Sequence, residues 1–398
     1  MSSIRREATA LKTAVMYGAG NIGRGFLGQL LSDSGYEVVF VDVNDAVVAR
    51  LNADRAYPVR VVSNAGAQET MVRNVRAVHG RDLDGVAAAI ARADLLATAV
   101  GVGALSHVAG PIAAGLHLRW SAVAPAPLDI IICENLIDAN RYLKRLVGEA
   151  LPEQERPWLD ARVGFVETSI GRMVPVMTPE MQEGNPLRVW VEEYAELPVD
   201  RDAFRGPIPP VRGLVPFSPF GLYIQRKLFI HNMGHALVAY LGQPKGYRHV
   251  WEAVADVEIL QVARAAMTES ARALAAEHCV ALEGLTAHIE DLLARFANRQ
   301  LGDTLERVGR DLSRKLAPGD RLIGALRCCL RNGIQPVNVC HGIAAAMRFP
   351  DPVPGPVSLL LQAGGPEEVL ERVCQLARGS WEWGQILSRY RALATTGA

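Results

Sequence analysis

The segment from Thr13 to Phe26 constrains this chain most, because a short apolar run leads directly into a glycine-rich turn. In such a turn Gly18 allows the tight bend, Gly20 lets the main chain approach a ligand, and Gly23 lets the next helix pack close to the strand. The free N–H groups at the start of that helix favour an anion. The segment therefore predicts a strand, a helix and, between them, a pyrophosphate-binding turn formed by Gly18, Ala19, Gly20, Asn21, Ile22 and Gly23.

A second apolar run, from Tyr36 to Asp42, ends in a carboxylate about twenty residues beyond the glycines, where the adenosine ribose of a dinucleotide lies. A carboxylate there accepts hydrogen bonds from the ribose hydroxyls and repels a 2′-phosphate, so NAD is favoured over NADP. The alternative is that Asp42 only caps a loop or the helix that begins near Asn44. Its distance from the glycines favours the ribose interpretation.

Two further positions are candidates for cofactor contact. Thr98 and Val100 end a buried apolar run, and small residues there would let the cofactor approach closely, although an ordinary strand end is an equal alternative. Arg24 follows the glycine turn and either contacts the pyrophosphate or is a solvated arginine.

Length and composition narrow the class of protein. A chain of 398 residues, of which 49% are hydrophobic, predicts two domains with substantial cores. Its 42 basic and 42 acidic residues balance, so we expect neither nucleic acid nor a membrane surface as a partner. No apolar signal core or membrane span is evident, and the six cysteines lack the spacing of a metal site. These features indicate a cytoplasmic protein that binds no metal.

The two halves of the chain differ in their hydrophobic pattern, and together they predict an α/β protein. Residues 1–215 alternate apolar runs with amphipathic segments, which predicts a Rossmann-type, doubly wound parallel sheet covered by helices. Short strands at 163–167 and 188–193 are expected to extend this sheet, and the Pro- and Gly-rich stretch 198–219 to cross between domains. Residues 216–398 are expected to form an all-helical domain, with helices near 222–241, 250–278, 285–296, 317–332, 339–347, 366–376 and 380–393.

The first of these helices carries Lys227, Asn232 and His235. At about 100° per residue, the three side chains fall within roughly 140° of the helix surface. A solvated polar face is the simpler explanation, but the apolar residues around them favour a partly enclosed site. We expect that site at the cleft between the two domains, near the carboxyl ends of the strands.

Four segments, which start at Gly18, Cys133, Arg226 and Glu306, resemble the polyol-specific long-chain dehydrogenase family. The K-x4-N-x2-H motif of that family is matched by Lys227, Asn232 and His235, and its other catalytic asparagine by Asn135. The resemblance implies metal-independent hydride transfer with NAD by a monomer. It also implies that Lys227 is the general acid/base, that Asn135 and Asn232 hold the reacting oxygen, and that His235 orients substrate hydroxyls.

Within that family, the chain is most similar to members that oxidise mannitol 1-phosphate to fructose 6-phosphate, which implies a hexitol phosphate as substrate. The matching basic stretch then assigns Arg307 and Lys315 to sugar oxygens and Arg310 or Arg314 to the phosphate. A solvated charged surface is the default alternative for such a run.

The chain departs from the family pattern at Gly171, where the family has an aspartate that faces the substrate, and at residues 311–313 of the basic stretch. Losing a hydrogen-bond acceptor is enough to redirect specificity. Two alternatives therefore stay open: the same chemistry on an unphosphorylated polyol or a sugar acid, and an inactive dinucleotide-binding sensor.

Overall fold

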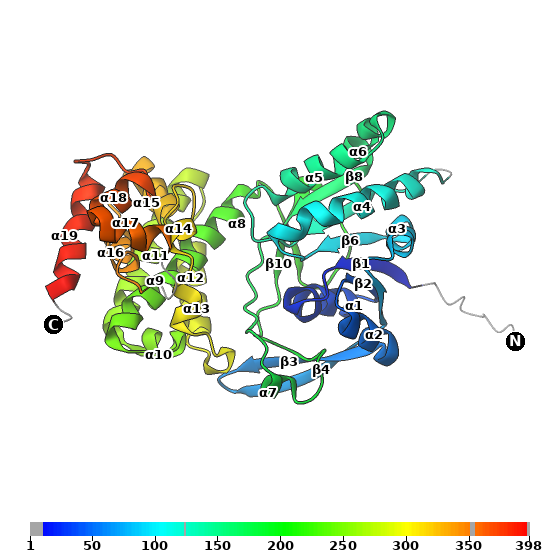
Figure 1. The fold of residues 1–398 in the computed structure, drawn as a ribbon, viewed down its shortest axis with the longest axis horizontal. Helices are drawn as coiled ribbons and strands as arrows, with labels where there is room; N and C mark the ends of the chain where they lie inside the picture. The colour runs from blue at the N-terminus through cyan, green and yellow to red at the C-terminus, as the bar shows by residue number, and fades with distance from the viewer. Residues whose placement is uncertain (1–10, 123–124, 351–354, 396–398) are drawn as a thin grey trace, which may run out of the picture. The chain divides into compact units, whose positions relative to one another are not determined.

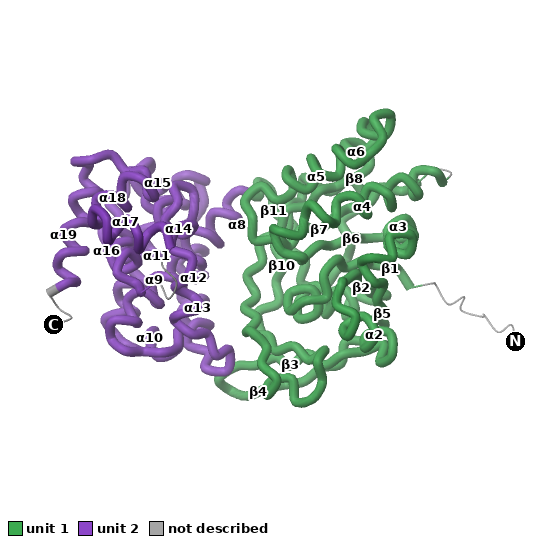
Figure 2. Tube along the Cα trace, in the orientation of Figure 1, with its two compact units in different colours: residues 1–220 green, residues 221–398 purple. Residues whose placement is uncertain are grey.

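A computed structural model describes residues 11–122, 125–350 and 355–395 of the chain. The chain divides into two units, unit 1 (Met1–Phe220) and unit 2 (Gly221–Ala398), shown in Figure 2. The hydrophobic pattern of the sequence predicts this division between residues 215 and 216.

Unit 1 is built on a six-stranded parallel sheet with the strand order β5-β2-β1-β6-β7-β8. This is the order of dinucleotide-binding folds, with the first strand near the centre and the strand order reversing beside it. The predicted fold class is therefore confirmed. The strands are β1 (Lys12–Tyr17), β2 (Tyr36–Asp42), β5 (Val75–His79), β6 (Leu95–Thr98), β7 (Leu128–Ile132) and β8 (Val163–Glu167).

The strands bury side chains on both faces of the sheet, because helices cover each face (Figure 1). Val15 and Val39 belong to one apolar cluster, whereas Met16 and Phe40 belong to the other. The first cluster includes residues of α3 (Leu83–Arg92), α4 (Leu105–Trp120), α5 (Ala139–Ala150) and α6 (Arg156–Arg162). The second includes residues of a π-helical segment (Gly23–Gly28), α1 (Gln29–Asp33) and α2 (Asp45–Asp54).

A separate three-stranded sheet packs on the π-helical segment that follows the glycine turn. Its strands are β4 (Gly66–Arg73), β3 (Ala56–Ser63) and β9 (Val189–Val191), in that order. The prediction that residues 188–193 extend the main sheet is wrong. Val189 and Val191 are buried against Gly25, where a β-carbon would lie 2.7 Å from Val189 Cγ1, so this strand covers the π-helical segment instead.

The predicted crossover contains regular structure. β10 (Leu197–Asp200) and β11 (Leu214–Phe217) form a parallel pair, and α7 (Pro179–Gln182) precedes them.

Unit 2 is helical throughout its described part. Its elements are α8 (Gly221–Arg226), a second π-helical segment (Lys227–Asn232), α9 (Met233–Gly242), α10 (Val250–Ala255), α11 (Val257–His278), α12 (Leu282–Phe296), α13 (Leu305–Gly309), α14 (Leu312–Lys315), α15 (Ile323–Arg331), α16 (Val337–Ala346), α17 (Pro356–Gly364), α18 (Pro366–Arg372) and α19 (Trp381–Thr395). The single helix predicted for 250–278 is broken at Asp256, whose side chain accepts hydrogen bonds from the N–H groups of Glu258 and Ile259 and so caps α11. The helix predicted for 317–332 begins only at Ile323.

The helix that carries the predicted catalytic motif is central to unit 2, and three neighbours approach it closely through glycines. If Gly324 of α15 carried a β-carbon, that atom would lie 2.6 Å from Phe229 Cε1. A β-carbon at Gly342 of α16 would lie 2.6 Å from Leu237 Cδ1. On α9 itself, a β-carbon at Gly234 would lie 2.5 Å from Met267 Sδ of α11. Within the described residues, no helix has the length and apolar character required to cross a membrane.

Candidate active site

The glycine turn has the geometry expected of a pyrophosphate cradle. Gly18 has φ 98° and its N–H donates to Val41 O at 2.8 Å, so the bend needs a residue without a side chain. A β-carbon at Gly23 would collide with the carbonyl of Gly18, which shows how closely the helix packs on the turn. A β-carbon at Gly20 would meet no atom within 4 Å, so this position leaves open space for a ligand.

Asp42 holds this turn from the neighbouring strand β2. Its Oδ2 accepts the N–H of Ala19 at 2.7 Å, and its Oδ1 accepts the N–H of Asn44 at 2.9 Å. Helix α2 is capped by the side chain of Asn44, which accepts from Val47 N–H at 3.1 Å. The carboxylate is only half-buried and retains lone pairs beyond these two bonds, so it can still accept from a ligand.

The other residues of the turn face different surroundings. Asn21 Nδ2 donates to Pro175 O at 3.3 Å, and Ile22 packs against the apolar core. Arg24 is not solvated, since it is 5% exposed and its guanidinium donates to Pro186 O at 3.1 Å. Burial lowers the pKa of Arg24. Its main-chain carbonyl accepts a hydrogen bond from the hydroxyl of Tyr57 at 2.8 Å, so both its side chain and its main chain form hydrogen bonds within the protein.

Thr98 and Val100 lie beside the glycine turn, because β6 pairs with β1. Thr98 is fully buried at the end of β6, and a β-carbon at Gly18 would collide with Ala99 O in the loop that follows. The N–H groups of Val100 and Gly101 both donate to the carboxylate of Glu134, each at 2.9 Å. Sequence reasoning missed Glu134, although a carboxylate directly after an apolar strand was a usable signal.

Asn135 follows Glu134 and is exposed in the loop after β7. Because β1, β6 and β7 are neighbours in the sheet, the structure brings Asn135 to the same carboxyl edge as the glycine turn and Thr98. Gly171 lies in a different environment, where a β-carbon would be 3.1 Å from Cε1 of Tyr194. The aromatic ring of Tyr194 therefore lies beside the position at which this chain departs from the family aspartate.

In unit 2, Lys227 and Asn232 are the first and last residues of the π-helical segment. The N–H of Met233 donates to Leu228 O, five residues earlier, which is the hydrogen bond of a π-helix. Residues five apart lie about one turn apart in this geometry, so Lys227 and Asn232 share a face more closely than the predicted α-helix would allow. Both side chains are half-buried.

His235 is held by an aromatic and an acidic neighbour. Its ring stacks on Phe296 with centroids 4.7 Å apart, and Nε2 lies 3.5 Å from Oδ2 of Asp303. Burial lowers the pKa of His235 to about 4 despite the opposing charge of Asp303, so the imidazole is neutral at pH 7. Arg307 forms an ion pair with the same Asp303. Asp303 is a second residue that sequence reasoning passed over, since nothing local indicated its partners.

The remaining predicted cations differ in their exposure and pairing. Lys315 is 4% exposed and donates to Val308 O, and burial, followed by the charges of Arg321 and Arg314, lowers its pKa to about 7. Arg314 is exposed and lies 2.5 Å from Asp311 and 3.5 Å from Asp320. Arg310 is exposed at the end of α13 and forms no ion pair with a described residue.

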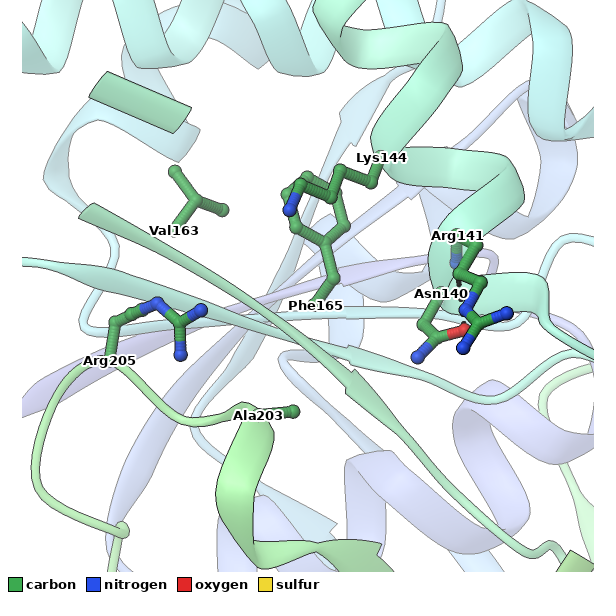
Figure 3. Close-up of a pocket in the computed structure, with 7 residues that line it drawn as sticks. All are labelled: Asn140, Arg141, Lys144, Val163, Phe165, Ala203 and Arg205. Carbon is green, nitrogen blue, oxygen red and sulfur yellow. Dashed lines mark hydrogen bonds between the residues drawn. The ribbon is translucent and has the colours of Figure 1, made fainter. Parts of the chain in front are cut away.

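Two pockets on the separate units contain none of the predicted site residues. Figure 3 shows the one in unit 1, with a cavity of about 130 Å³ lined by Asn140, Arg141, Lys144, Val163, Phe165, Ala203 and Arg205. The other, in unit 2, has a volume of about 400 Å³ and is lined by Gln243, Tyr247, Arg248, Thr304, Leu305, Glu306, Phe349 and Pro350. Among the described residues, no cluster of three or more His, Cys, Asp or Glu side chains could hold a metal ion.

Comparison with known proteins gives matches over nearly the whole chain. Residues 12–213 match the family model described as mannitol dehydrogenase Rossmann domain, and residues 221–354 match the mannitol dehydrogenase C-terminal domain. A substrate-free D-sorbitol dehydrogenase has a similar fold, with TM-score 0.81 and 16% identity over 96% of this chain and 93% of that one. Mannitol 2-dehydrogenase from Pseudomonas fluorescens, solved with NAD and D-mannitol, gives TM-score 0.77 and 17% identity over 98% and 93%.

Proposed function

This chain belongs to the mannitol dehydrogenase family in both of its domains, and from that membership we propose that it is an NAD-dependent polyol dehydrogenase. The observation that carries the proposal is the glycine turn, in which Gly20 faces open space while Gly18 and Gly23 are closed by main-chain contacts. That combination fits a bound pyrophosphate, since only the middle glycine must leave room for a ligand.

The half-buried carboxylate of Asp42 supports NAD over NADP. It already fixes the turn through Ala19, and its remaining lone pairs suit ribose hydroxyls, whereas a 2′-phosphate would meet a negative charge. Thr98 and Val100 would lie under the cofactor, next to the turn. When bound, NAD supplies the hydride acceptor for the reaction.

The chain's own residues have the remaining roles in this proposal. Oxidation of a secondary alcohol releases a hydride from carbon and a proton from oxygen. Lys227 accepts that proton at Nζ, and the amides of Asn135 and Asn232 donate hydrogen bonds to the oxygen as its charge develops. A neutral His235, oriented by Asp303 and Phe296, binds a neighbouring hydroxyl of the substrate.

For the substrate we propose a hexitol phosphate, mannitol 1-phosphate, which is oxidised to fructose 6-phosphate. Arg310 supports this assignment, because its guanidinium is exposed, forms no ion pair with any residue that the structure describes, and can bind a phosphate with two parallel hydrogen bonds. Arg307 and Lys315 would serve sugar oxygens and Arg314 would assist at the phosphate.

An unphosphorylated polyol is the second candidate, and the pairing of the basic stretch favours it. Arg307 is already paired with Asp303, and Arg314 with Asp311 and Asp320, so two of the four cations are compensated before any substrate binds.

Steady-state rates with mannitol 1-phosphate and mannitol, each with NAD and with NADP, and with a uronate, with NADH and with NADPH, test these assignments. We expect the highest kcat/KM with mannitol 1-phosphate and NAD. The variant R310Q should raise KM for the phosphate ester at least about tenfold and leave mannitol unchanged, because it removes a charge-assisted bidentate contact. R272Q, at an exposed arginine of α11, is the matched control. A preference for uncharged mannitol would refute the phosphate assignment.

The variant K227A tests the chemistry itself. It should abolish turnover while NADH still binds with nearly unchanged affinity, because the lysine acts on the substrate hydroxyl and not on the dinucleotide. K245A is the control, since Lys245 lies in the same unit and pairs with Asp256 and Glu258. NADH binding by the wild type without turnover of any polyol or sugar acid would instead indicate a sensor.

A further inference from the structure

Glu134 joins two loops of unit 1 through a pair of hydrogen bonds. It leaves the carboxyl end of β7, and its Oε1 and Oε2 accept the N–H groups of Val100 and Gly101, the consecutive residues that follow β6. The side chain is 7% exposed. A carboxylate offers two acceptor oxygens and no donor, so it can satisfy two parallel N–H groups at once.

Together with main-chain contacts on both sides, these two hydrogen bonds hold the loop after β6 in place. On one side, Ala99 N–H donates to Tyr17 O at 2.8 Å, and Gly18 packs directly on Ala99 O. On the other side, Cys133 N–H donates to Thr98 O at 2.8 Å, and Glu134 continues the connection. Gly101 has φ 85°, a conformation that glycine takes at little cost, and its N–H is one of the two that Glu134 holds.

Glu134 also helps to fix the position of the main chain of Asn135. Asn135 is the next residue along the chain, so its main chain is anchored through the side chain of Glu134 to the loop beside the glycine turn. The loop after β6 and the main chain of Asn135 are therefore joined by this carboxylate, in addition to the hydrogen bond between Cys133 and Thr98.

A buried carboxylate is a costly way to join two loops. Burial raises the pKa of Glu134, which means that the folded protein disfavours the charged form, although the two main-chain N–H groups partly offset this. The side chain is nevertheless held in one geometry, because both of its oxygens accept main-chain N–H groups.

We propose that Glu134 is a positioning residue that sets the distance between the cofactor floor at Thr98–Gly101 and Asn135. This rests on the proposed function, because it assigns to Glu134 the alignment of two parts of that same site. Loss of the clamp weakens NADH binding and, independently, slows the chemical step.

Asp129 provides a matched control on the same strand. It is 6% exposed, its carboxylate accepts the N–H groups of Arg205 and Gly206 at 2.7 and 3.2 Å, and burial raises its pKa as well. The substitutions E134Q and D129N therefore make the same chemical change to two buried carboxylates that each hold two amides. They differ in which loop loses its anchor.

The experiment compares wild type, E134Q, E134D and D129N in NADH affinity, in kcat at saturating NAD and polyol, and in amide hydrogen exchange. We expect E134Q to weaken NADH binding about tenfold or more, to lower kcat about tenfold or more, and to accelerate exchange at Val100 and Gly101. E134D, which keeps both acceptors on a shorter side chain, should recover part of each loss and keeps the test valid if E134Q folds poorly. D129N should accelerate exchange only at Arg205 and Gly206.

Each result separates the proposals. If E134Q changes NADH affinity and kcat no more than D129N does, Glu134 is merely structural and the inference is overturned. If NADH affinity falls but kcat is unchanged, the link to Asn135 is wrong. If the wild type neither binds NADH nor oxidises any polyol, the proposed function fails first, which the wild-type measurement alone reveals.

Discussion

At the scale of single residues, the three glycines of the turn do different work. Gly18 and Gly23 are required by contacts within the protein, because a β-carbon at either would collide with a main-chain carbonyl. Gly20 is required by no contact in the fold, since its surroundings are open. We propose that Gly20 is needed instead by a ligand that approaches the main chain there.

The variant G20A should therefore separate folding from binding. We expect its free energy of unfolding to be unchanged or raised by up to about 1 kcal/mol, because alanine restricts the unfolded chain. NADH affinity should fall at least about tenfold, since the methyl group enters the space of the pyrophosphate. G110A, on α4 and equally open, should raise stability without any effect on NADH. Equal NADH affinity in G20A and wild type would contradict the cradle.

The parts of the site that the sequence could predict are those that depend on local pattern. The glycine turn, Asp42 and the motif of Lys227, Asn232 and His235 are each readable within one strand–turn–helix unit or one helix. The parts that it could not predict depend on partners distant in the chain. Asp303 beside His235, Glu134 under Val100, and Pro186 beside Arg24 are brought together only by tertiary packing.

At the scale of elements, a similar distinction holds. Apolar runs followed by turns identified most strands of the main sheet but not β5. The strand β9 was assigned to the wrong sheet, because a short apolar run does not indicate which strand it pairs with. The break at Asp256 and the two π-helical segments were also not predicted, since capping competes with a continuing helical pattern and a π-turn leaves no periodicity of its own.

Two glycine substitutions in unit 2 should change the stability of the protein in opposite directions, because one glycine lies in a close helix–helix contact and the other lies in open space. G342A places a β-carbon 2.6 Å from Leu237 Cδ1 in a closed core and should destabilise the protein by about 1–3 kcal/mol. G284A, at an exposed and open position of α12, should stabilise it by about 0.5–1 kcal/mol. Chemical denaturation of both variants checks the pair. Similar unfolding free energies would show that α16 can move aside.

At the scale of the whole molecule, acid should affect the two units in opposite directions. In unit 2, burial lowers the pKa of His235 to about 4 and of His288 to about 3, from an ordinary value of 6.5. In unit 1, burial and then the nearby Asp138 and Asp200 raise the pKa of Glu167 to about 7, from 4.5. The unfolded chain therefore takes up protons first at the histidines, whereas the folded chain takes one up first at Glu167.

From these signs we expect unit 2 to lose stability as pH falls from 6.5 toward 4, and Glu167 to stabilise unit 1 as pH falls from 7 to 4.5. Calorimetry at pH 7 and pH 5 should show two unfolding transitions whose midpoints shift in opposite directions on acidification. H288Q should flatten the pH dependence of the transition of unit 2, and E167Q should flatten that of unit 1. H107Q, at an exposed histidine, should alter neither transition. A single transition that shifts as one would contradict this expectation.

The small three-stranded sheet has a consequence for how tightly a dinucleotide can be held. Tyr57 bonds to Arg24 O, and the guanidinium of Arg172 bonds to Gly25 O, Gln29 Oε1 and Glu192 O, so the helix behind the glycine turn is braced from outside the main sheet. A binding site that is rigid before the dinucleotide binds loses little conformational entropy on binding. Mutations of Tyr57 or Arg172 should therefore shorten the residence time of the bound dinucleotide.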